Sequence, residues 1–160
     1  MTESNQQSQR RQTPARVRKK ATIVVTKANY EALAEFRYAL RAFLAFSEEA
    51  ASAAGLTPQQ HQALLAIKGA PSADWLSISQ IAERLLIRHH TAVELVDRLA
   101  GLGFVVRKPD PIDGRRIQVH VTKAGEDMLR VLSASHLDEL RNIRPTLRKL
   151  LKQVENARPS

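Results

Sequence analysis

The chain of 160 residues contains no cysteine. Disulfide bonds, thiolate nucleophiles, cysteine-ligated zinc and thiol-based redox sensing are therefore excluded. Aromatic residues make up only 4% of the chain beside an apolar fraction of 43%, a balance that favours helical packing over a β-sandwich. No apolar run reaches the length of about 18 residues that a membrane span needs, and the polar N-terminus has no signal-like apolar segment. We expect a cytoplasmic protein that does not enter a membrane.

Acidic residues are also scarce, at 16 against 25 Lys and Arg, which gives a formal net charge of +9. This excess predicts a nucleic-acid partner, because Lys and Arg release counterions from a phosphate backbone. A solvated basic surface without a partner is the alternative. A net charge of +5 falls on residues 1–20, whose composition predicts a disordered tail. The tail is either an arm that binds DNA phosphates or a solubilising or expression-derived leader.

Apolar residues at steps of three and four predict a long N-terminal helix over residues 29–54 that stops at Gly55. Its apolar stripe consists of Leu33, Phe36, Leu40, Phe43 and Leu44. Thr57 and Gln60 form a capping-box pattern around Pro58 and predict a second helix that ends at Gly69. We expect a loop over residues 69–76.

Two short helices separated by about three residues predict a helix-turn-helix. Ser77 and Gln80 repeat the capping-box pattern and begin the first helix, and the second runs from near His89 to Leu102. The expected buried face of the second helix consists of Ala92, Leu95, Val96, Leu99 and Leu102. Its first turn and opposite face carry the side chains expected to contact DNA, which are Arg88, His89, His90, Thr91, Glu94 and Arg98. An ordinary solvated helix face is the alternative.

The apolar period changes from helical to alternating after Gly103. Residues 104–107 and 117–121 predict two strands joined by a turn-rich tip over residues 109–114, in the position of a wing. The wing's candidate DNA-binding residues are Arg107, Lys108, Asp113, Arg115 and Arg116. Asp113 lies two residues before Arg115, so its carboxylate could orient the guanidinium for a minor groove. A local salt bridge that stabilises the turn is the alternative.

Thr122 is expected to cap a long C-terminal helix, which Pro145 breaks or kinks before a final helix. The predicted fold is mainly α with a small β-hairpin wing, a winged helix-turn-helix between N- and C-terminal dimerisation helices. We divide the chain into a basic tail (1–20), an N-terminal dimerisation helix (21–56), a DNA-binding lobe (57–122) and C-terminal dimerisation helices (123–160). The terminal apolar stripes exceed what a small core can cover, which favours a homodimer. Packing of these helices only on each other is the alternative.

Three segments resemble the MarR (multiple-antibiotic-resistance regulator) family. Residues 110–116, followed by residues 119–122, resemble the family's wing signature. Residues 95–99 with Gly103 are similar to the end of its recognition helix, and residues 56–60 to the entry of its second helix. The resemblance spans roughly residues 33–155.

This resemblance implies a homodimer that binds a pseudo-palindromic operator, often as a repressor. It implies that Arg115 enters the minor groove and that Asp113 orients it. Many members of the family release DNA when a small aromatic or phenolic acid binds between the dimer helices and the DNA lobe. Glu94 and Gly114 depart from the residues that are common at these positions in the family. The resemblance therefore implies a preferred DNA sequence different from that of other members, and the loss of one phosphate contact at Gly114.

Helix order suggests a candidate ligand pocket near Phe36, Leu40, His61 and Leu65. No His-Glu-x-x-His run, Gly-rich phosphate loop or nucleophile elbow occurs, so we expect neither an enzyme nor a cofactor or metal. The predicted function is sequence-specific, DNA-binding transcription regulation. The expected partners are double-stranded DNA and a second copy of the chain, with a small-molecule effector as a third candidate. The alternatives are a winged-helix protein-interaction module and a non-specific architectural DNA binder.

Overall fold

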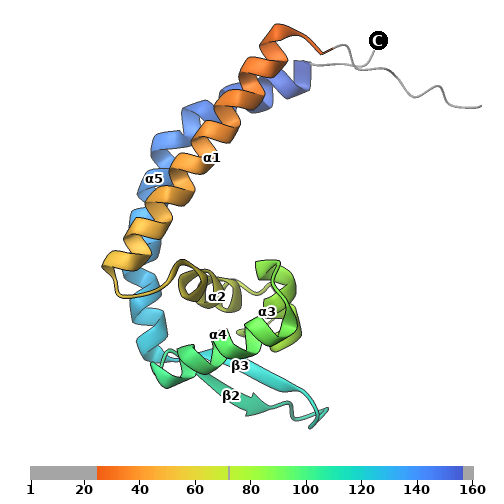
Figure 1. Ribbon diagram of the computed structural model, residues 1–160, viewed down its shortest axis with the longest axis vertical. Helices are drawn as coiled ribbons and strands as arrows, with labels where there is room; N and C mark the ends of the chain where they lie inside the picture. Colours follow the sequence, from red (N-terminus) through yellow and green to blue (C-terminus); the bar gives the residue numbers. More distant parts are fainter. Residues whose placement is uncertain (1–24, 72, 157–160) are drawn as a thin grey trace, which may run out of the picture.

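A long two-helix arm carries a smaller lobe of short helices and a sheet in the computed structural model, which describes residues 25–71 and 73–156 (Figure 1). Helix α1 (Lys27–Ala53) and helix α5 (Lys123–Asn156) run in opposite directions along the arm. The lobe is formed by the segment between them. The tail over residues 1–20 lies outside the described residues.

Helices α1, α2 (Pro58–Lys68) and α3 (Ile78–Leu85) each begin with a reciprocal capping box. In the predicted box of α2, the main-chain N–H of Thr57 donates to Gln60 Oε1 at 2.8 Å, and Ser77 makes the same bond with Gln80 at 2.9 Å. Both predicted boxes are therefore confirmed. Helix α1 begins two residues earlier than predicted, because Thr26 caps it.

A three-stranded antiparallel sheet lies beside these helices, in the order β1-β3-β2. It consists of β1 (Trp75–Ser77), β2 (Val105–Pro109) and β3 (Ile117–Val121). The wing strand predicted over residues 117–121 is confirmed, whereas β2 begins one residue and ends two residues later than the strand predicted over residues 104–107. The loop expected over residues 69–76 was wrong at its C-terminal end, because β1 begins at Trp75. Leu76 pairs with Val119 of β3. A three-residue strand is too short to show alternation, and its partner lies far along the chain, so local sequence gives no sign of it.

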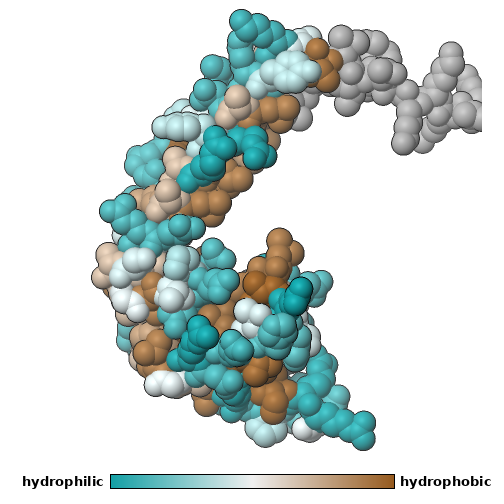
Figure 2. Space-filling view, viewed as in Figure 1, coloured by the Kyte–Doolittle hydropathy of each residue, from teal (hydrophilic) through white to brown (hydrophobic). Residues whose placement is uncertain are grey.

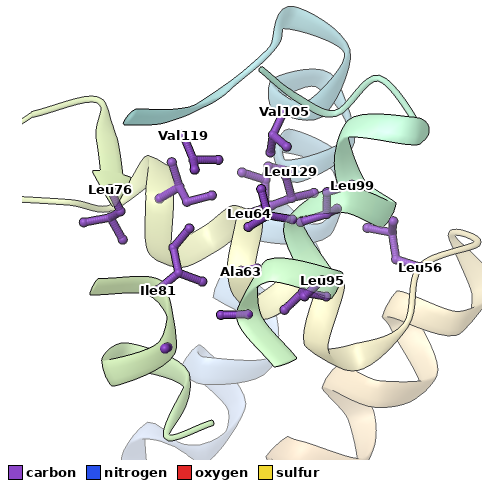
Figure 3. Close-up of a cluster of buried hydrophobic side chains, with 14 of the residues drawn as sticks. Leu56, Ala63, Leu64, Leu76, Ile81, Leu95, Leu99, Val105, Val119 and Leu129 are labelled. Atoms are coloured by element: carbon purple, nitrogen blue, oxygen red, sulfur yellow. The ribbon is translucent and has the colours of Figure 1, made fainter. Parts of the chain in front are cut away.

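The lobe has one hydrophobic core, to which every one of its helices contributes (Figure 3). Its fully buried side chains include Leu64 from α2, Ile81 from α3, Leu99 from α4 (His89–Gly101) and Val119 from β3. The predicted buried face of α4 is confirmed except at Leu102, which is half exposed because the helix ends one residue earlier. Burial of each such side chain contributes about 1.5–3 kcal/mol, and this core holds α4 and the wing in place.

Helix α5 continues through Pro145, so the predicted break and separate final helix were wrong. Proline removes only one main-chain N–H from the helix ladder, and the helix beyond it is supported because it lies along α1 (Figure 1). Within the described part of the chain, none of the helices is both long and apolar enough to cross a membrane.

Candidate nucleic-acid interface

The first turn of α4 is an electropositive, exposed end of a helix. Arg88 occupies the N-cap position, and no side chain among the described residues caps it with a hydrogen bond. The first main-chain N–H groups of α4 therefore point outward without an intrahelical partner, and the helix dipole adds positive potential there. Arg88, His89 and His90 are all exposed at this end, and Thr91 is half-buried. A phosphate group is the kind of ligand that such an end favours.

The outward face of α4 carries a weak internal ion pair. Arg98 Nη2 donates to Glu94 Oε2 at 3.5 Å, and both side chains are largely exposed. A pair of this kind contributes little to stability, so both groups are available to a partner. The predicted outward residues Glu94 and Arg98 are thus where the sequence placed them.

Asp110 organises the tip of the wing, a role that was not predicted from the sequence. One carboxylate oxygen accepts from the main-chain N–H groups of Ile112 at 2.9 Å and Asp113 at 3.1 Å, and the other accepts from Gln118 Nε2 at 3.2 Å. These hydrogen bonds, first that from Ile112, hold the pKa of the nearly buried Asp110 carboxyl below its usual range. The sequence signal was an Asp at the start of a turn, since Asp side chains bond the main chain two residues on.

Asp113 bonds the main chain rather than the Arg115 guanidinium, which corrects the expected contact. Its carboxylate accepts from the main-chain N–H of Arg115 at 3.1 Å, and its carbonyl oxygen accepts from the N–H of Arg116 at 2.8 Å. The side chains of Arg115 and Arg116 are exposed. Asp113 therefore fixes the direction of the chain from which both guanidinium groups project.

Arg107, a candidate DNA-binding residue of the wing, lies away from the wing tip and points inward. It pairs across the sheet with the fully buried Val119, and alternation from the buried Val105 places it on the inner face of β2. Its guanidinium turns toward α4, where Nη1 donates to Asp97 Oδ1 at 2.5 Å. Lys108, the next residue, is exposed. The period-two pattern beginning at Val105 was the signal that could have shown this.

The start of α4 and the wing meet at one open hollow of about 480 Å³. Three elements line it: the beginning of α3, the first residue of α4 and the wing. The lining residues are Ser77, Ile78, Ser79, Gln80, His89, Arg115, Arg116 and Ile117. Two of these lining residues are close to each other, since Ser79 Oγ lies 3.5 Å from His89 Nδ1. The fold thus brings residues of both predicted DNA-binding elements to one place, with hydroxyl, imidazole and guanidinium groups around it.

The four residues of the expected ligand pocket are not gathered at one site. His61 is buried against His136, with ring centroids 4.7 Å apart, whereas Leu65 is half exposed and lines a different hollow with Leu129. Phe36 is half-buried and Leu40 exposed on the arm. Within the described ranges, no group of three or more His, Cys, Asp or Glu residues could hold a metal ion.

A family model described as the MarR family matches residues 54–116, which include α2, the helix-turn-helix and most of the wing. Over these residues the chain is similar to the MarR family. An uncharacterized HTH-type transcriptional regulator of Bacillus subtilis, YkoM, is 34% identical over 59 residues. That alignment spans 37% of this chain and 38% of the curated relative. The range of the family model falls on the lobe that carries the candidate interface.

Solved structures of MarR-family proteins share the fold of nearly the whole chain. The MarR-family transcriptional regulator AbsC of Streptomyces coelicolor superimposes with a TM-score of 0.65 at 18% identity, over 85% of this chain and 93% of that one. A mutant of S. aureus MepR bound to an oligodeoxyribonucleotide gives a TM-score of 0.59 at 19% identity, over 78% and 97%. At these identities the likeness shows the fold alone. The chain thus shares the fold of AbsC, which is described as a MarR family transcriptional regulator.

Proposed function

We propose that this protein is a homodimeric transcription regulator that binds a specific sequence in duplex DNA. The observation that carries the proposal is the hollow that joins His89 at the start of α4 to Arg115 and Arg116 of the wing. Two DNA-contacting elements with converging cations fit a duplex, whose phosphates lie along both edges of a groove. Helix α4 would enter the major groove, and the wing would reach the adjacent minor groove.

The charge distribution of the described lobe supports this orientation. The uncapped, positive end of α4 faces the same side as the exposed wing cations, and Figure 2 shows a strongly hydrophilic surface at the projecting wing tip. The acidic groups of the tip, Asp110 and Asp113, accept hydrogen bonds from the main chain and thus leave Arg115 and Arg116 to face a partner. Phosphate contacts of this kind make affinity fall steeply with salt.

The arm supports the proposal of a homodimer. The buried residues of α1 are the small Ala32, Ala39 and Ala51, whereas Leu33, Leu40 and Leu44 of the apolar stripe are 42–53% exposed. On α5, large apolar side chains are also exposed, namely Leu137, Leu140 and Leu151. Figure 2 shows apolar surface along the arm. Contiguous exposed apolar surface of this kind marks an interface, and a second copy of the same arm would cover it symmetrically.

Repression and release by a small aromatic or phenolic ligand complete the proposed mechanism. Two α4 helices about 34 Å apart would enter successive major grooves of a pseudo-palindromic operator and exclude other proteins from it. A ligand would release the DNA only if it bound more tightly to a dimer whose two α4 helices are wrongly spaced for DNA than to the DNA-binding dimer. A ligand with equal affinity for both states does not shift the equilibrium between them. The aromatic cluster of Phe43, Phe46, His61 and His136, where α1, α2 and α5 meet, is the place we would probe for such a ligand.

In vitro selection from a library of random-sequence duplexes tests the proposal, because it requires no assumption about the operator sequence. We expect the full-length protein to enrich an inverted repeat whose half-sites lie one helical turn apart, about 10–10.5 base pairs. Enrichment of a single half-site would contradict the homodimer. Retention of duplex without enrichment would indicate an architectural binder, and no retention at low salt would favour a protein-interaction module.

A further inference from the structure

We propose that the ion pair between Asp97 of α4 and Arg107 of β2 fixes the angle of the wing against the helix that enters the major groove, and so determines which base pairs the wing contacts. We call this pair the Asp97–Arg107 bridge. The inference rests on the proposed function, because it assigns a positioning role within the same DNA interface. Neither residue needs to touch DNA for this role.

The Arg107 guanidinium contacts two successive turns of α4. Nη1 donates to Asp97 Oδ1 at 2.5 Å, and Nη2 donates to the carbonyl oxygen of Val93 at 3.4 Å. Val93 and Asp97 are four residues apart and therefore lie one above the other on the helix. A planar guanidinium with donors in a fixed fork can hold both acceptors at once, which restricts the rotation of β2 relative to α4.

The Asp97–Arg107 bridge lies where the core ends and the projecting part of the wing begins. Along the inner face of β2, Val105 is buried, Arg107 is half-buried and Pro109 is exposed. Arg107 Nε is buried and has no hydrogen-bond partner among the described residues. The guanidinium is thus partly removed from water, so its interaction with Asp97 is screened less than that of a fully exposed pair.

The position of the bridge gives it leverage over the wing tip. Beyond Arg107, the hairpin projects from the lobe (Figure 1), and β2 pairs there only with β3. A strand rises about 3.3 Å per residue, so the tip lies on the order of 10–20 Å farther out, and a tilt of about 10° would move it by 2–3 Å. A shift of this size exceeds what a hydrogen bond tolerates. Loss of the bridge should therefore disturb contacts made by Arg115 more than contacts made by α4.

Asp97→Asn separates this positioning role from a direct phosphate contact by Arg107. If Arg107 bound a phosphate, removal of the neighbouring carboxylate would free the guanidinium and reduce repulsion of DNA, and affinity would rise. If the bridge positions the wing, the same substitution loosens the wing and affinity falls. The two roles thus predict opposite signs for one conservative change.

The test uses full-length wild type, Asp97→Asn, Arg107→Gln and the double variant, each subjected to selection from random-sequence duplexes. Affinity for the wild-type consensus duplex is then measured by fluorescence anisotropy at several salt concentrations. We expect each single variant to bind DNA about five- to tenfold more weakly than wild type. The double variant should bind no more weakly than either single variant, because all three lack the same Asp97–Arg107 interaction. The salt slope should stay at its wild-type value. Selected sequences should lose their preference at the flanking minor-groove positions and keep it at the central major-groove positions.

A matched control is Asp138→Asn, which removes the acid of the exposed pair with Arg141 on the arm. It should leave both the consensus and the affinity unchanged. Circular dichroism and thermal unfolding verify folding of each variant. If Arg107→Gln fails to fold, Arg107→Lys takes its place, because it keeps the charge but cannot contact both acceptors through a fork. It should reproduce the loss of preference at the flanking positions.

Three results would overturn the inference. Equal affinity and an unchanged consensus in all variants would show that the Asp97–Arg107 bridge does not position the wing, while the proposed function would stand. Tighter binding by Asp97→Asn, with a salt slope reduced by about one in Arg107→Gln, would make Arg107 a phosphate contact. A wild-type protein that selects no sequence would refute the sequence-specific function and, with it, the inference.

Discussion

His61 of α2 and His136 of α5 face each other with ring centroids 4.7 Å apart, where the arm joins the lobe. His136 Nδ1 lies 2.6 Å from the carbonyl oxygen of Leu132, which can only accept, so Nδ1 is the donor. His136 Nε2 lies 2.8 Å from Ser47 Oγ of α1. His61 Nδ1 is buried and has no hydrogen-bond partner within the described part of the chain. The cluster therefore joins three helices. Its His61 imidazole is buried, and its Nδ1 has no partner in the described part of the chain, so it is poorly suited to carry a positive charge.

Stability should fall as the pH falls because of His61. Burial, and secondarily repulsion by His136, lower the pKa of His61 below its ordinary value of 6.5. The unfolded chain thus takes up a proton that the folded chain resists, so the contribution of His61 is fully present above about pH 6.5 and is lost below it. We expect the wild-type free energy of unfolding, measured in urea at fixed protein concentration, to drop between about pH 7.5 and pH 5. His61→Phe should show a smaller drop, and superimposable pH profiles would refute this assignment.

Arg115→Ala should weaken DNA binding without loss of structure. The side chain is exposed at the wing tip, so its removal costs little stability. If it contacts a groove, the loss should be about 1–3 kcal/mol of binding free energy. Anisotropy titration on a selected duplex measures this, with circular dichroism as the control for helix content. Unchanged affinity in a natively helical variant would count against the role of the wing.

Asp110→Ala should impair DNA binding more than Asp113→Ala. Asp110 accepts two main-chain hydrogen bonds and one from Gln118, whereas the Asp113 carboxylate accepts one from the N–H of Arg115. Loss of Asp110 thus leaves the whole tip without its stabilising hydrogen bonds, whereas loss of Asp113 mainly leaves the main chain at Arg115 less fixed. Parallel titrations of both variants on one duplex rank the two effects. The reverse order would show that the Asp110 network is not what positions the arginines.

Leu140→Asp should convert a dimer into monomers and weaken DNA binding with it. Leu140 is 39% exposed on the proposed interface face of α5. Val131, which is 67% exposed, lies nine residues earlier and therefore about 180° around the same helix. Val131→Asp is the matched control and should sediment like wild type. Sedimentation velocity over a range of concentrations decides the matter, and a dimer that survives Leu140→Asp would place the interface elsewhere.

Gly125→Ala should destabilise the fold, whereas Gly101→Ala should not. A Cβ atom at Gly125 would overlap the carbonyl oxygen of Phe104 and lie 2.7 Å from Cγ1 of Val121, where α5 crosses the end of the sheet. Such overpacking costs about 1–3 kcal/mol. A Cβ atom at Gly101 would meet open space, and Ala at that helical position should stabilise by on the order of 0.5 kcal/mol. Urea unfolding of both variants tests the contrast, and equal midpoints would contradict it.

The features that the sequence predicted correctly are local ones. The capping boxes at Thr57 and Ser77 depend on residues three apart, and the buried face of α4 depends on the helical period. The wing follows from strand alternation on either side of a turn. In each case the interacting groups are close along the chain, so the pattern of residue types determines the outcome.

The features that the sequence did not predict depend on distant segments. Strand β1 exists because β3 pairs with it, and α5 continues past Pro145 because it lies along α1. Ser47 meets His136 only because α1 and α5 lie side by side in the arm. Arg107 differs: its inner position follows from alternation, but its bond to Asp97 requires the angle between β2 and α4, which no local pattern contains.

The most direct test of the proposed function is a salt-dependent anisotropy titration of the full-length protein. It compares a duplex from upstream of the protein's own gene with a scrambled duplex of equal length. A sequence-specific regulator should bind the first duplex more tightly, and affinity for both should fall steeply as salt rises, because phosphate contacts release counterions. No binding to either duplex at low salt would contradict the assignment of the α4 and wing surface as a DNA interface.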